Sequence, residues 1–226
     1  MRSVRWWWVP LVLVGCRSTD ANDVAGSTVV PSTTVMPSTT VMPSTTVMPS
    51  TTLVSAGKPW FTFVSAAAVA GWSVQNDTVM GGASSGTVGW DGAAMLFAGT
   101  VSTDNNGGFS SVVSPLVAAP TLDTPEAVRL RIRGDGKTYV FQVRTSAADE
   151  LRYIQRFDTT IGVDQTVSLP LAAFEPVDRF LEPFVGSAPL SLPSMNQLAI
   201  YILDGQVGPF ELRVRDITVV QAEAPQ

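Results

Sequence analysis

The sequence predicts an all-β domain, built as a sandwich or a barrel, from two observations. About ten runs of strand length follow one another along the chain, separated by turn signals such as Asp91-Gly92. Several of these runs alternate apolar and polar residues, and residues 127–133 place three aliphatic side chains opposite three arginines. This period of two is typical of half-buried antiparallel strands, and almost no stretch shows the period of a helix. Many short strands with regular turns are typical of β-sandwiches and barrels.

The composition fits one domain with appendages and excludes several functions. The chain has 226 residues, of which 45% are apolar, enough for one good-sized core. The formal net charge of −5 gives no electrostatic reason to expect nucleic-acid binding. Histidine is absent, which removes the commonest metal ligand and the usual general base near neutral pH. The single cysteine, Cys16, excludes an intramolecular disulfide.

Residues 1–16 are predicted to be an export signal. Two arginines precede an apolar run that is far shorter than the ~20 residues of a membrane-spanning helix. The ending L-V-G-C resembles the lipobox of bacterial lipoproteins, in which the cysteine is lipidated. The resemblance implies a protein outside the cytoplasm that is anchored through Cys16 to a bacterial cell membrane.

Residues 17–57 are predicted to be a low-complexity spacer. They carry P-S-T-T-V-M three times, beginning at Pro31, Pro37 and Pro43. A repeat this short, with a proline in every copy, does not favour a β-helix, whereas Pro/Ser/Thr tracts are typical of extended stalks. As a polyproline helix the spacer would span roughly 120 Å and lift a domain clear of lipid headgroups.

The folded domain is predicted at residues 58–221 and is followed by a short tail, 222–226. Two connections are predicted as hairpin turns, residues 103–108 and Gly134-Asp135-Gly136, and the second would form the clearest hairpin in the chain. Residues 171–175 are predicted as a loop or a single helical turn, and a proline-interrupted loop follows. Strands are expected at residues 60–64, 86–90, 95–102, 109–116, 127–133, 137–145, 151–158, 166–170, 197–203 and 210–220.

Several short motifs resemble those of one known family. Residues 76–85 read N-D-T-V-M-G-G-A-S-S, residues 105–111 read N-N-G-G-F-S-S and residues 133–139 read R-G-D-G-K-T-Y. With G-P-F-E-L at 208–212, they resemble the family of the complex I intermediate-associated protein of 30 kDa. The resemblance implies a jelly-roll sandwich similar to galactose-binding-like and carbohydrate-binding domains. Members of that family include assembly factors for respiratory complex I.

The loop that follows Trp72 is the first candidate binding site. Its polar side chains and glycine amides would offer a fixed set of donors and acceptors to a sugar or a peptide. In the alternative interpretation Asp77 caps local backbone amides, Met80 plugs one end of the sandwich and Trp72 belongs to the core. The candidate ligand-binding residues of this loop are Asn76, Asp77, Met80, Gly81, Gly82 and Ser84.

Arginines on the predicted strands are the second candidate. Arg129, Arg131 and Arg133 share one face of a strand, and other strands carry Arg144, Arg152, Arg156, Arg213 and Arg215. A basic sheet face would bind an anionic glycan or an acidic protein surface, and Arg131 and Arg133 are the candidate ligand-binding residues there. The alternative is a solvated outer face in which the arginines pair with carboxylates across strands.

Neither a metal, a cofactor nor catalysis is expected. The oxygen ligands of Asp104, Asn105, Asn106 and Asp135 suit Ca²⁺, but they lack EF-hand spacing and asparagine-rich turns need no metal. Without histidine a Ser-His-Asp arrangement is impossible. The carboxylate pair to consider for glycoside hydrolysis is Asp77 with Asp104 or Asp135.

The sequence therefore predicts a non-catalytic binding module at the cell envelope. From the family resemblance, the expected ligand is a protein partner in assembly or scaffolding. The alternative is a carbohydrate-binding module that recognises an envelope or environmental glycan. Membrane attachment is expected through lipidated Cys16, and no nucleic-acid partner is expected.

Overall fold

The structure, a computed structural model, describes residues 57–145 and 151–221. The predicted signal peptide with Cys16, the spacer up to residue 56 and the tail lie outside the described residues. Across the described residues, no helix is long and apolar enough to cross a membrane.

Twelve strands and five short helical segments make up the described chain. The strands are β1 (Gly57–Thr62), β2 (Ser73–Asn76), β3 (Ser85–Trp90), β4 (Met95–Val101), β5 (Ser110–Val113), β6 (Pro125–Arg133), β7 (Thr138–Thr145), β8 (Arg152–Asp158), β9 (Asp164–Pro170), β10 (Glu175–Val177), β11 (Met195–Ile202) and β12 (Gly208–Gln221). The helical segments are α1 (Ala66–Val69) and the 3₁₀ turns η1 (Asp77–Met80), η2 (Asp104–Asn106), η3 (Leu171–Ala173) and η4 (Leu192–Ser194).

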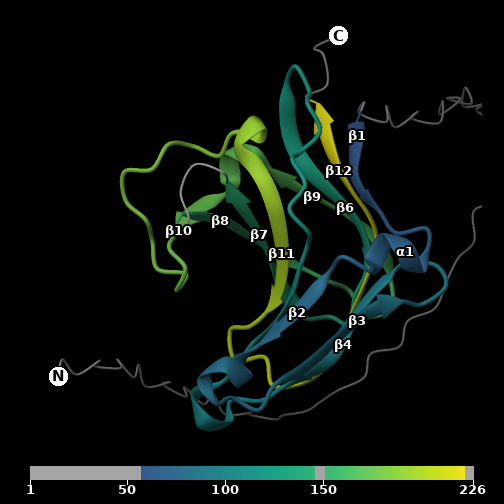
Figure 1. The fold of residues 1–226 in the computed structure, drawn as a ribbon, viewed down its shortest axis with the longest axis vertical. Coiled ribbons are helices and arrows are strands. Elements are labelled where there is room, and N and C mark those ends of the chain that lie inside the picture. The colour runs from purple at the N-terminus through teal and green to yellow at the C-terminus, as the bar shows by residue number, and fades with distance from the viewer. Residues whose placement is uncertain (1–56, 146–150, 222–226) are drawn as a thin grey trace, which may run out of the picture. The chain divides into compact units, whose positions relative to one another are not determined.

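The strands form two antiparallel sheets. The first sheet has the order β3-β4-β12-β6-β9, with β1 added on β12, and the second sheet has the order β10-β8-β7-β11-β5-β2. Figure 1 shows β10, β8, β7 and β11 on one side of the domain and β12, β6 and β1 on the other. The predicted all-β sandwich is therefore confirmed, and each strand pair is antiparallel as the period-two patterns require.

The core lies between the sheets and consists of the inward-facing apolar residues of the alternating strands. Leu130 of β6, Phe141 of β7 and Leu212 of β12 have no exposed surface. Trp72 is buried in the same cluster, with its ring edge-on to Phe63, so its predicted place in the core is confirmed. One continuous cluster of this kind fixes which face of each strand points outward.

Both predicted hairpins are wrong, because each connection crosses from one sheet to the other. The Gly134-Asp135-Gly136 turn leads from β6, which pairs with β12 and β9, to β7, which pairs with β8 and β11. The turn at 103–108 likewise leads from β4 in the first sheet to β5 in the second. Glycine-rich turns suit either a hairpin or a crossing, and the period of two is the same in both sheets.

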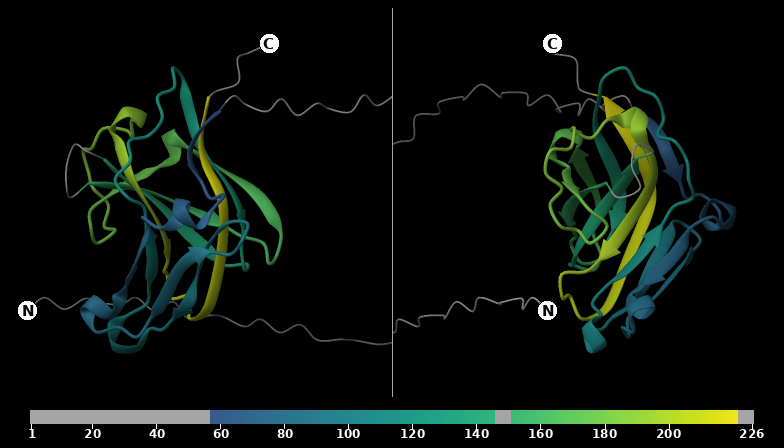
Figure 2. Two further views of the ribbon diagram at one scale, coloured as in Figure 1. Left: turned by 45° about the vertical axis from the view of Figure 1, so that its right-hand side comes forward. Right: turned by 60° about the vertical axis from the view of Figure 1, so that its left-hand side comes forward.

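Two short strands were not predicted, and both border the second sheet. β2 lies inside the expected binding loop, and β10 lies at the start of the expected proline-interrupted loop. The ends of the described chain lie side by side, since Gly57 of β1 pairs with Val220 of β12. In the two further views β12 (yellow) runs the length of the domain (Figure 2), and its 14 residues pair with β1 and β4 in succession along one edge.

Candidate functional site

A groove of about 980 Å³ lies on the outer face of the second sheet. Side chains that alternate with the core residues reach this face, so Gln142 and Arg144 line the groove while Phe141 and Val143 point inward. The neighbouring strands β11 and β8 contribute Tyr201 and Arg152. The loop after β10 contributes Arg179, Phe180 and Leu181, and the loops around β2 and β5 contribute Asn76, Thr78, Met80, Asn106, Gly107, Gly108 and Phe109.

Aromatic and amide side chains are among those that line the groove. The rings of Tyr201 and Phe109 lie 6.3 Å apart between centroids, and both are half-buried. The amide of Gln142 lies 3.4 Å from the hydroxyl of Tyr201. Beneath them Val140 and Ile154 belong to a second, smaller apolar cluster that supports this face. Tyr201 and Phe109 pack against this cluster, and Gln142, although it lines the groove, is only 3% exposed.

The candidate loop borders the groove, but its members differ in position. Asn76 and Met80 line the groove, and the amide oxygen of Asn76 accepts a hydrogen bond of 2.7 Å from the hydroxyl of Ser110. Met80 is 65% exposed, so the expectation that it plugs an end of the sandwich is wrong. The positive φ of Gly81, 88°, ends the η1 turn and is the conformation that glycine adopts without strain.

Asp77 is buried and holds the loop to its neighbours. Its carboxylate accepts hydrogen bonds from the hydroxyl and the amide of Ser84, at 2.5 and 3.0 Å, and from the amides of Gly108 and Phe109, at 2.6 and 3.2 Å. Burial alone would raise the pKa of Asp77, but these hydrogen bonds outweigh it and hold the pKa below its ordinary value. We call Asp77, Gly82, Ser84, Gly107 and Gly108 the Asp77 knot.

The two Gly-Gly pairs of the motifs are explained by this one carboxylate. A Cβ atom on Gly82 would lie 2.4 Å from the carboxyl carbon of Asp77, and one on Gly107 would lie 2.5 Å from its Oδ2. The other member of each pair, Gly81 or Gly108, takes a positive φ. The Asp77 knot therefore requires glycine in both Gly-Gly pairs, and it holds in place the loops that border the groove.

The candidate arginines Arg131 and Arg133 lie away from the groove, on the outer face of the first sheet. Arg131 forms an ion pair with the mostly buried Asp216 of β12. The structure therefore does not bring these arginines together with Asn76 and Met80.

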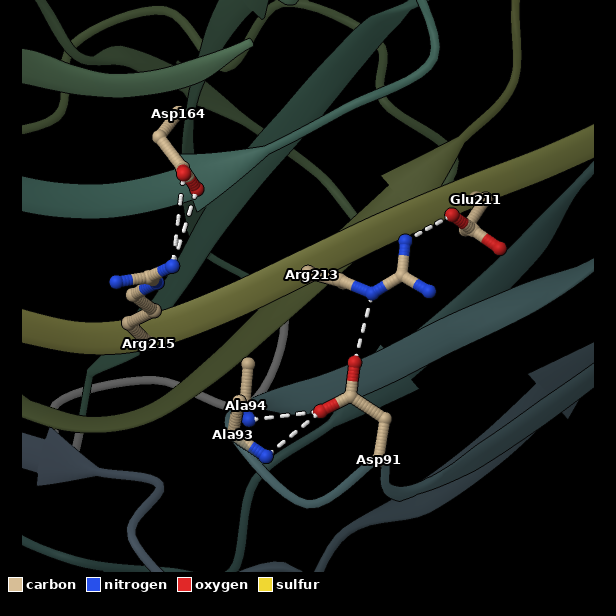
Figure 3. A network of polar contacts seen from close by, with 7 residues as sticks. All are labelled: Asp91, Ala93, Ala94, Asp164, Glu211, Arg213 and Arg215. Atoms are coloured by element: carbon tan, nitrogen blue, oxygen red, sulfur yellow. Dashed lines mark hydrogen bonds and ion pairs between the residues drawn. The ribbon is translucent and has the colours of Figure 1, made fainter. Parts of the chain in front are cut away.

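Ion pairs cover much of the rest of that face. Figure 3 shows Arg213 of β12 between Asp91 and Glu211, and Arg215 beside Asp164 of β9. Burial alone would raise the pKa of Asp91, but hydrogen bonds from the amides of Ala93 and Ala94 and from Arg213 hold it below the ordinary value. The cross-strand pairing predicted as the alternative is found here.

Asp135, considered for metal binding and catalysis, holds the crossing between the sheets. Its carboxylate accepts hydrogen bonds from the hydroxyl of Tyr139 at 3.2 Å and from the amides of Lys137 and Glu211 at 3.1 and 2.9 Å. Burial raises the pKa of Tyr139, and the charge of Asp135 adds to the effect. Within the described ranges, no three carboxylate, histidine or cysteine side chains gather to hold a metal ion.

Comparison with known sequences identifies the family. The sequence model of the family described as complex I intermediate-associated protein 30 (CIA30) matches residues 61–214. The chain belongs to the CIA30 family. The matched range extends from β1 into β12 and includes the Asp77 knot, so the motif residues of this CIA30 domain coincide with the contacts that shape one edge of the groove. No curated protein sequence matches the chain.

Several solved structures share the fold of this CIA30 domain. The family 11 carbohydrate-binding module of cellulase Lic26A-Cel5E from Clostridium thermocellum is 16% identical, with a TM-score of 0.56, over 76% of this chain and 99% of that one. The same module in complex with a β-1,3-1,4-mixed-linked tetrasaccharide gives a TM-score of 0.55. The agarase AgWH50C matches with a TM-score of 0.54 and 9% identity, but this chain spans a quarter of that enzyme.

Most residues of the groove were not predicted from the sequence. Gln142, Tyr201 and Phe180 were not named as candidates, and Arg144 and Arg152 were named only among the other arginines. The period of two shows that Gln142 and Arg144 share a face, but the pattern does not say that β7 lies between β8 and β11. The missing information was the pairing of strands far apart in the chain.

Proposed function

We propose that this protein is a non-catalytic binding module that holds a polysaccharide chain in the groove of the second sheet. The observation that carries the proposal is the lining of the groove. Tyr201 and Phe109 are half-buried aromatic side chains of this lining, and aromatic rings suit the apolar face of a sugar. Asn76 adds an amide group, which both donates and accepts hydrogen bonds as sugar hydroxyls require, and the buried Gln142 donates a hydrogen bond to the hydroxyl of Tyr201.

The likeness to carbohydrate-binding modules supports a glycan as the ligand. The family 11 module shares the sandwich along almost its whole length and is solved with a bound tetrasaccharide. At 16% identity this support concerns the fold, so the residues that line the groove of this chain determine which glycan binds.

Two of the three carboxylates considered for hydrolysis, Asp77 and Asp135, favour a role without catalysis. A glycosidase general acid needs a raised pKa, whereas the pKa of Asp77 is lowered. Asp77 and Asp135 are already hydrogen-bonded to backbone amides of the loops they hold, and neither carboxylate lines the groove. Both carboxylates serve the fold.

A protein partner is the second candidate, and the loop after β10 favours it. Phe184 is 40% exposed and Val185 is 93% exposed, and exposed apolar side chains of this kind are found at protein contacts. The name of the family, an intermediate-associated protein of complex I, points to the same class of ligand.

A panel of polysaccharides, measured by isothermal titration calorimetry, tests the proposal. Saturable binding of at least one polysaccharide is expected, and Tyr201→Ala is expected to weaken it at least about tenfold by removing a ring face. Tyr201→Phe keeps the ring, and Thr166→Ala alters the exposed face of the first sheet, so both are expected to bind as the unchanged protein does. If no polysaccharide saturates the protein while a defined membrane complex co-purifies with it, the protein partner replaces the glycan.

We also propose that the module is held at the outer side of a bacterial membrane by lipid on Cys16. The support is the resemblance of residues 13–16 to a lipobox and the Pro/Ser/Thr spacer that follows. Metabolic labelling with a fatty acid is expected to mark the protein and to fail with Cys16→Ser. Equal labelling of both proteins would contradict the anchor.

A further inference from the structure

We propose that Phe180 is a further ligand-contacting residue, which stacks on a second sugar unit of an extended, β-1,4-linked chain. This inference rests on the proposed function and names the class of polysaccharide and the length that the groove recognises. Phe180 lies in the loop after β10 and lines the same groove as Tyr201 and Phe109. It is 69% exposed, which leaves its ring open to a ligand.

A small hairpin holds Phe180 in position. The backbone amide of Asp178 donates a hydrogen bond of 2.9 Å to the oxygen of Glu182, and the amide of Phe184 donates one of 3.0 Å to the oxygen of Pro176. Oδ1 of Asp178 accepts two more hydrogen bonds, from the amides of Phe180 and Glu182, at 2.7 and 3.0 Å. We call residues 176–184 the Phe180 hairpin.

The turn of the Phe180 hairpin is anchored to the sheet by Leu181. The φ of Leu181 is 65°, in the left-handed region that few residues other than glycine adopt. A three-residue hairpin turn often ends with a residue in this conformation. Leu181 is half-buried and packs against the smaller apolar cluster, as Phe109 and Tyr201 do. This packing offsets the strain and fixes the hairpin near the two rings, because strained backbone persists only where its surroundings hold it.

The ring of Phe180 also has a preferred orientation. The guanidinium carbon of Arg179 lies 4.8 Å from the centroid of the ring, a cation–π contact. Such a contact favours one orientation of the ring, so less conformational entropy is lost when a ligand binds.

The groove is long enough for several units of one chain. Its lining extends from β2 across β5, β11 and β7 to β8, and these strands are neighbours in that order. Neighbouring strands lie about 4.8 Å apart, so the lining crosses roughly 19 Å of the sheet from β2 to β8. That length exceeds a disaccharide. The Phe180 hairpin follows β10, which is the next strand after β8.

Two separate aromatic positions favour a ribbon-like chain. In a β-1,4-linked chain of pyranoses the units extend as a ribbon, and each unit presents a face of C–H groups that suits an aromatic ring. An α-1,4-linked chain curls, and successive units turn their faces away from one line. Tyr201 with Phe109 on the sheet and Phe180 on its hairpin therefore fit the β-1,4-linked class.

The test measures how affinity depends on chain length. Cello-, xylo- and manno-oligosaccharides of three and of six units are titrated into the protein by calorimetry, with malto-oligosaccharides of the same lengths as α-linked controls. At least one β-1,4-linked series is expected to bind, with the six-unit chain at least about tenfold tighter, because only the longer chain reaches Phe180 as well as Tyr201. The malto-oligosaccharides are expected to bind more weakly than that series.

Four variants locate the effect. Phe180→Ala is expected to weaken binding of the six-unit chain at least about fivefold and of the three-unit chain less than about twofold. Phe180→Tyr keeps the ring and is expected to keep the affinity. Phe184→Ala is the matched control, because Phe184 belongs to the same hairpin but is not among the residues that line the groove, and less than a twofold change is expected. Asp178→Ala loosens the hairpin and is expected to weaken binding of the six-unit chain alone.

Thermal unfolding separates a contact from a structural role. Because Phe180 is mostly exposed, Phe180→Ala is expected to unfold at the same temperature as the unchanged protein. A loss confined to the six-unit chain, restored by Phe180→Tyr and without a change in unfolding temperature, supports the inference.

Three results would overturn the inference. The first is an affinity that does not rise with chain length. The second is a loss with Phe180→Ala that is equal for both lengths or is matched by Phe184→Ala. The third is binding of a polysaccharide by a protein that binds none of the three β-1,4-linked series, which would leave the proposed function intact. If no polysaccharide binds at all, the proposed function fails as well.

Discussion

The two sheets each carry a pair of arginines that face each other across adjacent strands, and the surroundings of the two pairs differ. On the first sheet Arg133 is opposite Arg213, and Arg213 is bound by Asp91 and Glu211. On the second sheet Arg144 is opposite Arg152 in a groove whose described lining has no carboxylate. The same residue type at the same spacing is therefore paired with carboxylates on one face and lines a groove on the other.

This difference shows why arginines alone do not mark a binding face. An ion pair between exposed side chains contributes little to stability and consumes the donors that a ligand would need. A guanidinium held by a neutral amide, as Arg144 is by Gln197, keeps its charge uncompensated by that contact. The contacts of Arg213 and Arg144 therefore differ, although each of these arginines is opposite another arginine in its sheet.

The largest effect is expected at the Asp77 knot, because it joins loops of both sheets and would change both faces at once. Asp77→Ala would leave the buried amide of Ser84 and the part-buried amides of Gly108 and Phe109 without this acceptor, and we expect a loss of about 3 kcal/mol in the free energy of unfolding. Chemical denaturation measures this loss. Polysaccharide affinity is expected to fall as well, since Gly108 and Phe109 line the groove.

The pH dependence of stability, compared between the unchanged protein and Asp77→Asn, tests whether the ionised carboxylate of Asp77 is the cause of the stabilisation. The pKa of Asp77 is lowered in the folded protein, so its stabilisation is fully present above the unfolded pKa of about 4 and is lost as the pH falls through the folded value. The difference in unfolding free energy between the unchanged protein and Asp77→Asn is therefore expected to be constant near neutral pH and to shrink below about pH 4. A difference that grows in acid would contradict the assignment.

A smaller effect is expected at Gly134, where the chain passes from the first sheet to the second. A Cβ atom there would lie 2.3 Å from Cβ of Thr159, so Gly134→Ala is expected to cost about 2 kcal/mol of stability. Gly89→Ala is the matched control, because its Cβ would meet no atom within 4 Å. Thermal unfolding that gives equal midpoints for the two variants would show that the crossing tolerates the movement.

The smallest effects are expected on the outer face of the first sheet, and they sharpen the contrast with the groove. Arg131→Gln leaves the mostly buried Asp216 without its ion pair and is expected to cost about 1 kcal/mol. Arg215→Gln breaks a pair with Asp164 whose side chains are 51% and 55% exposed, and is expected to cost less than about 0.5 kcal/mol. Denaturation measures both, and neither is expected to alter polysaccharide affinity. A tenfold loss of affinity with either variant would move the ligand to this face.

The sequence predicted the sandwich because the period of two shows directly which residues of each strand face the core. Leu130, Phe141 and Leu212 are buried as those patterns require. The pattern did not predict that β6 and β7 belong to different sheets, since a glycine turn and alternating residues suit a hairpin equally well.

The candidate site was predicted in part. Local motifs located Asn76 and Met80, which line the groove, because loop chemistry depends on residues near in sequence. Gln142, Arg144, Arg152 and Tyr201 come together only through the β8-β7-β11 pairing, over separations of up to 59 residues. Such a site can be predicted only when the order of the strands in the sheet is known, and the alternation of apolar and polar residues does not specify that order.

NMR titration of the protein with a polysaccharide that it binds is the most direct test of whether the outer face of the second sheet binds the ligand. Backbone amide signals of residues 142–144 and 197–201 are expected to move with a single saturation curve, while those of residues 129–133 and 211–215 stay in place. Movement concentrated at residues 129–133 and 211–215 would show that the ligand binds the first sheet instead.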